Sequence, residues 1–547
     1  MKSSTIFRAA ALLVAAGVLA PACSDDLGDL FPAQGSTIPK NFAPAPGGLR
    51  RLLGRQYVNS VRLLLGEAGA QAATTPPDGS LHGFDSIGAA ELSLPPSAVA
   101  TYEASARAIG EAAVVDQGTL TRILPCAPSG PADAACHRQF VTSFGRLAWR
   151  RDLEQPEVDR VTGIAQAAST AYSDFNAGVA YAIAALLQSP NFLYIVELGE
   201  PALDLPEMRR LTKGELATRM SFFLLGQAPD AELLDFVDQN ELDAGTIREL
   251  ATELVARPEA REELAEFYGE ILRIRDLSEL AKSEELFPQF NPDLARAMKE
   301  ETLRIIDEVV WNQDTDVREL LTADFTFVNQ DLAALYGVEP PPGDDFTRVT
   351  LPPSQRRSGI LSTSAFLSRF AHPDQTSPTR RGLFIRTTVL CEDIEPPPPG
   401  VSTTLPGPDS QMTLKQQLEQ HMKDPNCRSC HRAMDPIGFA LENYDAIGAF
   451  RTHDNGLPID STATDVQGIG SFASARELGA LLQEDPRVSL CVIKNLLRSS
   501  LGHLETPGEK PAIGQMDGAF AAQGYRMQAL LVELVASPAF QLVGDPK

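Results

Sequence analysis

The chain has 547 residues, with 43% hydrophobic and 22% charged content; this is ordinary globular composition with room for roughly three to five domains. It excludes an intrinsically disordered chain. The formal net charge of -25 argues against a basic patch that binds nucleic acid or an anionic membrane surface, so we expect no nucleic-acid partner. The acidity is better explained by solubility than by steering of a cationic partner.

The N-terminus has the pattern of a secretory signal. Lys2 and Arg8 flank the start of the apolar run "AAALLVAAGVLA", which is too short to span a bilayer. We expect a signal peptide over 1–22, and the "PAC" string resembles a bacterial lipoprotein cleavage site that would leave Cys23 acylated. The alternative is an ordinary signal peptide with Cys23 free. Residues 23–47 are predicted to be a tether, so the sequence predicts an exported, membrane-anchored lipoprotein facing the periplasm or cell surface.

The first folded segment is predicted to be a small helical domain over 48–118. Its string "LRRLLGRQYVNSVRLLLG" places apolar residues on one stripe of an amphipathic helix that ends at Gly66. The residues on this stripe are Leu49, Leu53, Tyr57, Val61 and Leu64. The stripe needs a partner helix to cover it.

A second helical domain is expected over 119–174. Its helical region runs from His137 to about Ala167, and Pro156 opens the second of its helices. The basic cluster in this region is predicted to be a solvated or ion-paired face rather than a binding site. Its members are Arg146, Arg150 and Arg151.

A large helical core domain is predicted over 175–345. The run from Phe175 to Leu187 is apolar nearly all round, which is typical of a buried helix, and Pro190 is expected to end it. Thr212 and Glu215 have capping-box spacing at the start of another core helix that ends at Gly226. Strand signals are few: an alternation around Phe325 and Phe327, followed by a helix from Asn329 to Tyr336, and the stretch 345–352.

The cysteines divide into two groups. Setting aside Cys23 and the Cys-x-x-Cys pair leaves Cys126, Cys136, Cys391 and Cys491, an even number in a disulfide-permissive compartment. Three pairings are formally possible. Because Cys126 and Cys136 bracket a short loop, we expect them to pair, which leaves Cys391 with Cys491. The alternative for the latter two is a pair of buried thiols.

The string "HPDQTSPTRRG" also contains residues that could act chemically. His372, Ser377, Arg380 and Arg381 offer a base, a nucleophile and an anion clamp. No Gly-x-Ser-x-Gly elbow surrounds Ser377, which precedes a proline. A structural loop capping the following helix is therefore favoured.

A Cys-x-x-Cys-His string lies within a predicted module over 354–465. With 7 Cys and 7 His in the chain, this string is expected by chance roughly once in a thousand such chains, and its spacing is that of c-type haem attachment. Cys427 and Cys430 can each add to a vinyl group on one porphyrin edge while His431 reaches the iron. We therefore expect covalent haem c, with His431 as the proximal iron ligand.

The sixth ligand is not determined by the sequence. The preferred candidates are Met412 and Met422, because a segment just before the motif could fold back over the haem. The histidine candidates are His421 and His453, and more distant alternatives are His503, Met516 and Met527. A methionine ligand would favour electron transfer, whereas an open site would favour peroxide or gas chemistry.

Residues after the motif are assigned supporting roles. Pro436 and Gly438 are expected to turn the chain away after the attachment helix, and Phe439 and Leu441 to wall the porphyrin. Two alternatives stay open for Glu442 and Arg451: contact with a haem propionate, or a salt bridge to each other. The remaining residues, 470–547, are predicted to form a C-terminal helical domain.

Several collinear strings carry a family resemblance. They include "FGRLAWRRDLEQPEV", "LLQSPNFLYIVE", "GILSTSAFLSRFAHPDQTSPTRRGLFIRTTVLCEDIEPPPPGV" and "GYRMQALLVELVASPAF", together with the motif string. The chain resembles exported multidomain proteins of planctomycete and myxobacterial type assembled from domains of unknown function 1587, 1595, 1592, 1588 and 1585. The resemblance implies a mainly α, multi-helical assembly with a small c-type-cytochrome-like module, and no agreed reaction.

Three classes of function follow, in order of preference. The first is a lipid-anchored protein with one c-type haem that transfers electrons to an unidentified redox partner protein or couples them to an oxidation. The second is a peroxidase-like haem enzyme, which requires an open sixth position. The third is a non-haem structural or binding lipoprotein with a thiol pair or a zinc site, in which His421 or Asp435 would join the Cys-x-x-Cys-His residues. Whether the protein is an enzyme is left open.

Overall fold

The structure, a computed structural model, describes residues 38–202, 204–343, 345–395 and 411–546. The predicted signal peptide, Cys23 and most of the tether lie outside these residues. Among the described helices, none is long and apolar enough to cross a membrane.

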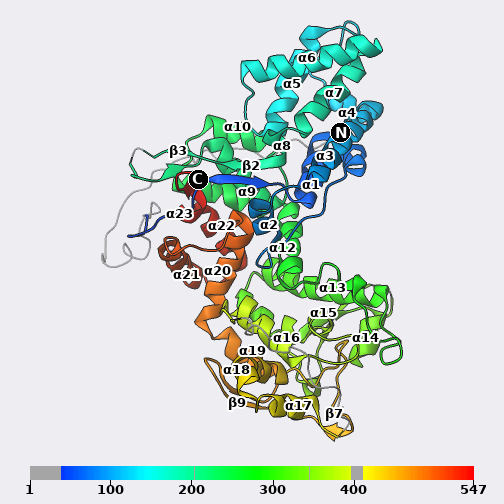
Figure 1. Ribbon diagram of the computed structural model, residues 1–547, viewed down its shortest axis with the longest axis vertical. Coiled ribbons are helices and arrows are strands. Elements are labelled where there is room, and N and C mark those ends of the chain that lie inside the picture. The colour runs from blue at the N-terminus through cyan, green and yellow to red at the C-terminus, as the bar shows by residue number, and fades with distance from the viewer. Residues whose placement is uncertain (1–37, 203, 344, 396–410, 547) are drawn as a thin grey trace, which may run out of the picture. The chain divides into compact units, whose positions relative to one another are not determined.

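Helices dominate the described chain, which confirms the predicted mainly α fold (Figure 1). The helices of the N-terminal part are α1 (Gly54–Ala72), α2 (Asp85–Glu91), α3 (Pro96–Val115), α4 (Gln117–Ile123), α5 (Ala134–Trp149), α6 (Gln155–Tyr172), α7 (Phe175–Leu187) and α8 (Pro190–Leu193). The central helices are α9 (Lys213–Leu225), α10 (Ala231–Gln239), α11 (Ala244–Val255), α12 (Pro258–Ile271), α13 (Pro292–Asp307) and α14 (Gln330–Tyr336). The C-terminal helices are α15 (Ser364–Arg369), α16 (Pro378–Phe384), α17 (Leu414–His421), α18 (Pro425–Phe439), α19 (Ala475–Gln483), α20 (Pro486–Leu501), α21 (Lys510–Ala522), α22 (Met527–Ala536) and α23 (Pro538–Gln541).

The strands are short and pair antiparallel in small sheets. They are β1 (Gly48–Arg51) with β2 (Tyr194–Glu197), β3 (Glu200–Pro201) and β11 (Leu542–Val543) on either side of β4 (Arg209–Arg210), β5 (Phe325–Val328) with β6 (Thr347–Thr350), β7 (His453–Asp454) with β8 (Leu457–Pro458), and β9 (Ala463–Val466) with β10 (Gly470–Phe472). The β5–β6 hairpin and α14 confirm the strand and helix predicted around Phe325 and from Asn329.

Local capping signals in the sequence correspond to observed helix ends. The Thr212 hydroxyl accepts a hydrogen bond from the Glu215 backbone N–H, and the Glu215 side chain accepts one from the Thr212 N–H, so the predicted capping box starts α9. Gly226 follows α9 in the left-handed conformation. Nine residues of the 13-residue α7 are buried, as expected for a helix that is apolar nearly all round.

Three local predictions for the N-terminal half are wrong, those for the start of the first helix, for Pro190 and for Arg150. The first residues of the predicted amphipathic helix form β1 instead, because they pair with β2 more than 140 residues away. Leu49 is therefore exposed rather than part of a buried stripe. Gly66, with φ 73° and ψ -169°, lies outside the helical region and separates two helical segments within α1, so the helix end predicted there is confirmed. Pro190 begins α8 rather than ending α7. Arg150 is buried rather than solvated, because its guanidinium donates to the backbone oxygens of Asn191, Phe192 and Tyr194.

The buried apolar residues form two main clusters. The smaller contains residues of β2, α1 and α3–α9, including Tyr57, Phe140 and Phe192, together with Leu52 directly after β1. The larger runs from Phe42 to Val543 and includes apolar residues of α18 and of the loop that follows it. The C-terminal end of the helix that carries the Cys-x-x-Cys-His string is therefore packed into the main core through Ile437, whereas the turns with Cys427 and Cys430 are partly exposed.

Two glycines allow α16 and α18 to pack backbone against backbone. A Cβ atom at Gly382 would overlap the backbone of Met434, and one at Gly438 would overlap the backbone of Pro378. Gly438 therefore serves this close approach rather than a turn, and α18 continues through Pro436 to Phe439. This contact fixes the attachment helix against α16.

Both predicted disulfides are present. Cys126 pairs with Cys136, and Cys391 pairs with Cys491, so the second bridge encloses 100 positions that include α17 and α18. Cys391 directly follows the π-helical turn Ile385–Val389 that extends α16, and Cys491 lies on α20. The bridge therefore ties the α16 segment to α20.

Candidate cofactor-attachment site

The first turns of α18 carry the three residues of the motif. Pro425 lies at the first helical position, where the missing N–H costs nothing, and the N–H groups of Cys427 and Arg428 donate to the Asp424 carbonyl. Cys427 and Cys430 are free thiols and are both partly exposed. Cys430 Sγ lies 3.7 Å from the backbone oxygen of Glu395, the last described residue before 396–410. Two unpaired thiols thus lie on one helix beside His431.

A buried carboxylate holds the His431 ring. His431 Nδ1 lies 2.8 Å from Asp435 Oδ2, one helical turn further along α18. The Thr379 hydroxyl of α16 donates to Asp435 Oδ1 over 2.7 Å. Asp435 is fully buried, and its hydrogen bond raises the pKa of His431 above the usual value.

This hydrogen bond determines which ring nitrogen of His431 can act as a ligand. A carboxylate partner keeps the proton on Nδ1, which leaves the lone pair of Nε2 available. Within the described part of the chain, Nε2 has no hydrogen-bond partner. From the sequence, Asp435 is expected as part of the string that follows the motif and as a possible zinc ligand, whereas its hydrogen bonds to His431 and Thr379 are not predicted. The i, i+4 spacing of His431 and Asp435 on a predicted helix is the signal that could have identified the pair.

The two methionine and two histidine candidates for the sixth ligand lie in different surroundings. The His421 ring, at the end of α17, is 4.9 Å from the His431 ring, centroid to centroid, at an interplanar angle of 81°. Met422 caps α17, and its carbonyl accepts from Arg428. His453 is exposed on β7, with Nδ1 3.0 Å from the hydroxyl of Thr452. Of these candidates, His421 is the one that the structure brings into ring contact with His431.

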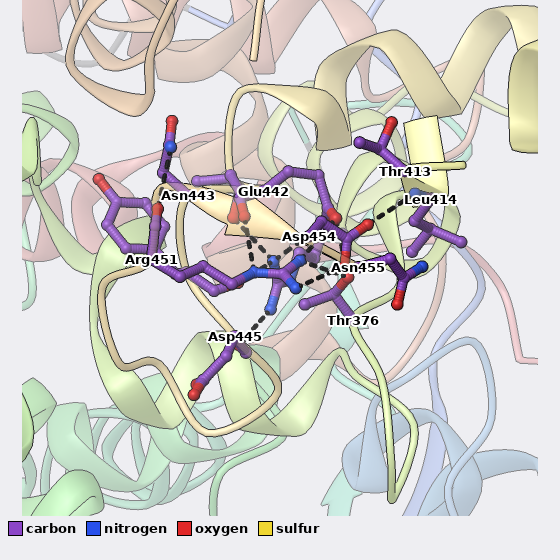
Figure 2. Close-up of polar contacts among 12 residues, drawn as sticks. Thr376, Thr413, Leu414, Glu442, Asn443, Asp445, Arg451, Asp454 and Asn455 are labelled. Carbon is purple, nitrogen blue, oxygen red and sulfur yellow. Dashed lines mark hydrogen bonds and ion pairs between the residues drawn. The ribbon is translucent and has the colours of Figure 1, made fainter. Parts of the chain in front are cut away.

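The backbone of the fourth candidate, Met412, contacts Asn455, which belongs to a polar network around Arg451 that Figure 2 shows. The Met412 carbonyl accepts from the Asn455 amide over 2.9 Å. The neighbouring Asp454 accepts from the backbone N–H of Leu414, over 2.7 Å, and pairs with Arg451 over 2.9 Å. The network therefore fastens the start of α17 to the β7–β8 hairpin.

Arg451 also pairs with Glu442, which answers one open question from the sequence. The guanidinium lies 3.1 Å from Glu442 Oε2, and the same oxygen accepts from the Thr376 hydroxyl over 2.8 Å. Glu442 is buried, with a second arginine, Arg381, 3.6 Å from its other oxygen. The salt-bridge alternative is thus the one found, and no contact with a propionate is needed to explain this pair.

The "HPDQTSPTRRG" string is structural around Ser377 and Arg381. The Ser377 hydroxyl accepts from the Arg380 N–H and caps α16, as predicted. Arg381 is fully buried and donates to backbone oxygens of Leu367, Leu441 and Asp445. Ser377 therefore serves as a helix cap, and Arg381 holds the loop that follows α18.

The residues present fit a c-type haem at its attachment and proximal positions. The thiols are unpaired, and His431 has one anchored and one free ring nitrogen. Cys427, Cys430 and His431 would hold the group, with Asp435 orienting the histidine. For the zinc alternative, no three His, Cys, Asp or Glu side chains of the described residues are gathered closely enough to hold a metal ion.

Five family models match the chain, and each is described as a protein of unknown function. They are DUF1587 over residues 50–115, DUF1595 over 136–197, DUF1592 over 211–338, DUF1588 over 357–454 and DUF1585 over 470–540. The DUF1588 match contains the whole attachment site. No curated protein and no solved structure matches the chain. The chain therefore belongs to the family of proteins built from these five domains of unknown function, in the order that the sequence predicted.

Proposed function

We propose that the protein is an exported, lipid-anchored electron-transfer protein with haem c attached through Cys427 and Cys430. The observation that carries the proposal is the geometry at His431, where Asp435 fixes Nδ1 and Nε2 is left free beside two unpaired thiols. When bound, the group supplies one-electron exchange. The signal peptide, the acylation of Cys23 and a redox partner protein belong to the same proposal, and they rest on the sequence alone.

The protein residues have separate tasks in this proposal. Asp435 keeps a proton on Nδ1 and thereby increases the electron donation of His431 at Nε2. Thr379 holds the carboxylate from the facing helix. Because Asp435 is buried without an arginine or lysine partner among the described ion pairs, its negative charge is little screened by solvent. This arrangement favours the oxidised form of a bound redox centre and lowers its reduction potential.

The same observation favours a second candidate, a peroxidase-like haem enzyme. A strongly donating proximal histidine supports cleavage of an O–O bond as well as electron transfer. The two functions would differ in whether a second protein side chain also held the haem: electron transfer would keep such a ligand, whereas peroxide chemistry would need it absent or displaceable. A non-haem protein with a thiol or zinc site is the remaining alternative.

Haem attachment and axial ligation can be tested with one set of variants. Protein matured in a host with c-type haem machinery is separated by denaturing electrophoresis and stained for haem. The proposal predicts stain on the wild-type chain and none on Cys427→Ser/Cys430→Ser. The matched control is Cys126→Ala/Cys136→Ala, which removes two cysteines elsewhere and should keep the stain. Loss of stain in both variants, or in neither, would contradict attachment at Cys427 and Cys430.

Carbon monoxide separates the two haem functions. Electron transfer predicts a reduced spectrum that carbon monoxide leaves unchanged, because a protein ligand fills the sixth position. Rapid formation of a carbon monoxide complex, together with reaction with peroxide, would favour the peroxidase-like enzyme instead. Single alanine variants of His421, Met412, Met422 and His453 then identify the ligand as the residue whose removal admits carbon monoxide.

A further inference from the structure

A cavity of about 550 Å³ lies apart from the attachment site. It is lined by residues from the loop before α2, the end of α12, α15, α16 with its π-helical extension, and α20. Four of the lining side chains are arginines, so we call this cavity the arginine pocket. The arginines are Arg273, Arg369, Arg380 and Arg498. Its volume lies within the range of sites for small molecules.

The arginine pocket carries an uncompensated positive charge. None of its described lining residues is acidic. Arg498 pairs with Glu505 over 2.8 Å, whereas Arg273, Arg369 and Arg380 have no carboxylate partner in the described part of the chain. Burial, together with the charge of nearby Arg369, lowers the pKa of Arg273. In a chain of net charge -25, such a concentration of unpaired arginines indicates an anionic occupant.

The backbone at Arg273 supports a role for its side chain. This residue follows the C-terminus of α12 with φ 58°, in the left-handed region that favours glycine. His82, another lining residue, has φ 53°. A residue other than glycine is strained in this conformation, and such strained residues cluster at ligand-binding and active sites. Among the described residues, no side-chain hydrogen bond ties the Arg273 guanidinium to a neighbour.

The rest of the wall is apolar. Phe84, Phe370 and Phe384 line the arginine pocket. A second, apolar cavity of about 70 Å³ adjoins it and shares Phe384 and Ile271 among its lining residues. A ligand that fills both regions therefore needs a charged head and an apolar body. Inorganic phosphate or acetate would leave the aromatic wall without a partner.

We propose that the arginine pocket binds a small organic acid whose carboxylate is joined to an aromatic or other apolar body. The carboxylate accepts hydrogen bonds from Arg369 and Arg273, because guanidinium forks match carboxylate geometry. The apolar body packs on the phenylalanine wall. This assignment does not depend on the proposed function, since it requires neither haem nor an intact Cys-x-x-Cys pair.

Calorimetric titration of the full mature chain with 3-phenylpropionate tests the assignment. Its neutral amide, 3-phenylpropanamide, tests the need for charge, and acetate tests the need for the apolar body. We expect the acid to bind at least about tenfold more tightly than either control. The amide lacks the charge that strengthens the hydrogen bonds to arginine, and acetate lacks the apolar body that would be buried on the phenylalanine wall. No binding of the acid, or equal binding of the acid and either control, would overturn the proposal.

Variants place the binding in this pocket. Arg369→Gln is expected to weaken binding of 3-phenylpropionate at least about tenfold. Arg273→Gly is expected to weaken it similarly while keeping or raising the melting temperature, because glycine relieves the left-handed backbone. The control is Arg160→Gln, at an exposed arginine of α6, which should leave binding unchanged. Unchanged affinity in Arg369→Gln and Arg273→Gly, or equal loss in Arg160→Gln, would overturn the assignment to the arginine pocket.

Discussion

The two disulfides should contribute unequally to stability. The Cys391–Cys491 bridge closes 100 positions of chain, whereas Cys126–Cys136 closes 10. If a bridge stabilises mainly by restricting the unfolded chain, the long loop contributes about 4.7 kcal/mol and the short loop about 2.7 kcal/mol. The predicted difference is therefore about 2 kcal/mol in the free energy of unfolding.

The burial of the cysteines makes this comparison well matched. One cysteine of each bridge lies in the core, Cys136 with 3% and Cys491 with 1% of its surface exposed. Replacing both members of a pair by alanine therefore removes a similar number of buried atoms in the two variants. The sulfur atoms of the long bridge also accept contacts from Arg498 Nη1, at Cys391 Sγ, and from Asn495 Nδ2, at Cys491 Sγ, each over 3.6 Å.

Urea unfolding of the wild type and the two double-alanine variants, followed by circular dichroism, measures the difference. We expect Cys391→Ala/Cys491→Ala to lose about 2 kcal/mol more than Cys126→Ala/Cys136→Ala. Equal losses, or a larger loss from the short bridge, would refute the loop-entropy reasoning. Such a result would place the stabilisation in local contacts instead.

Two further predictions concern glycine packing and a buried acid. Gly382→Ala should destabilise the fold by about 1–3 kcal/mol because its Cβ atom would overlap the Met434 backbone. Gly163→Ala, where no atom lies within 4 Å of the added Cβ atom, should instead stabilise α6 by up to about 1 kcal/mol. Changes in melting temperature of the same sign in the two variants would contradict this prediction. Burial raises the pKa of Glu301 from 4.5 to about 7. The folded state therefore accommodates the neutral carboxyl group better than the charged one. Its contribution to the free energy of unfolding is fully present below about pH 4.5 and is lost as pH rises through about 7. The free energy of unfolding of Glu301→Gln minus that of the wild type should therefore be larger at about pH 8 than at about pH 5, by roughly 3 kcal/mol at most. A difference that does not change with pH would be evidence against this prediction.

Features set by neighbouring residues could be predicted from the sequence. The Thr212–Glu215 capping box and the Ser377 cap depend on a few adjacent positions, and both occur as expected. The Cys126–Cys136 bridge follows from a short loop. The motif of the attachment site is equally local, because its thiols and histidine lie within five consecutive residues of one helix.

Features that need distant partners could not be predicted. The residues of β1 have an apolar period that predicts a helix, and they form a strand because Tyr194–Glu197 pairs with them. Arg150 is buried because backbone oxygens some 40 residues away accept its hydrogen bonds. The arginine pocket brings Arg273, Arg369 and Arg498 together from three separate helices or their ends. A single sequence contains no local signal for such encounters.

The central claim is that Cys427 and Cys430 carry one covalent haem, and intact-protein mass spectrometry tests it most directly. The measurement uses denatured, mature protein from a host with c-type haem machinery. We predict the polypeptide mass plus that of one haem, with the haem found on the peptide containing Cys427 and Cys430 after proteolysis. A bare polypeptide mass, with both thiols open to alkylation, would contradict the claim.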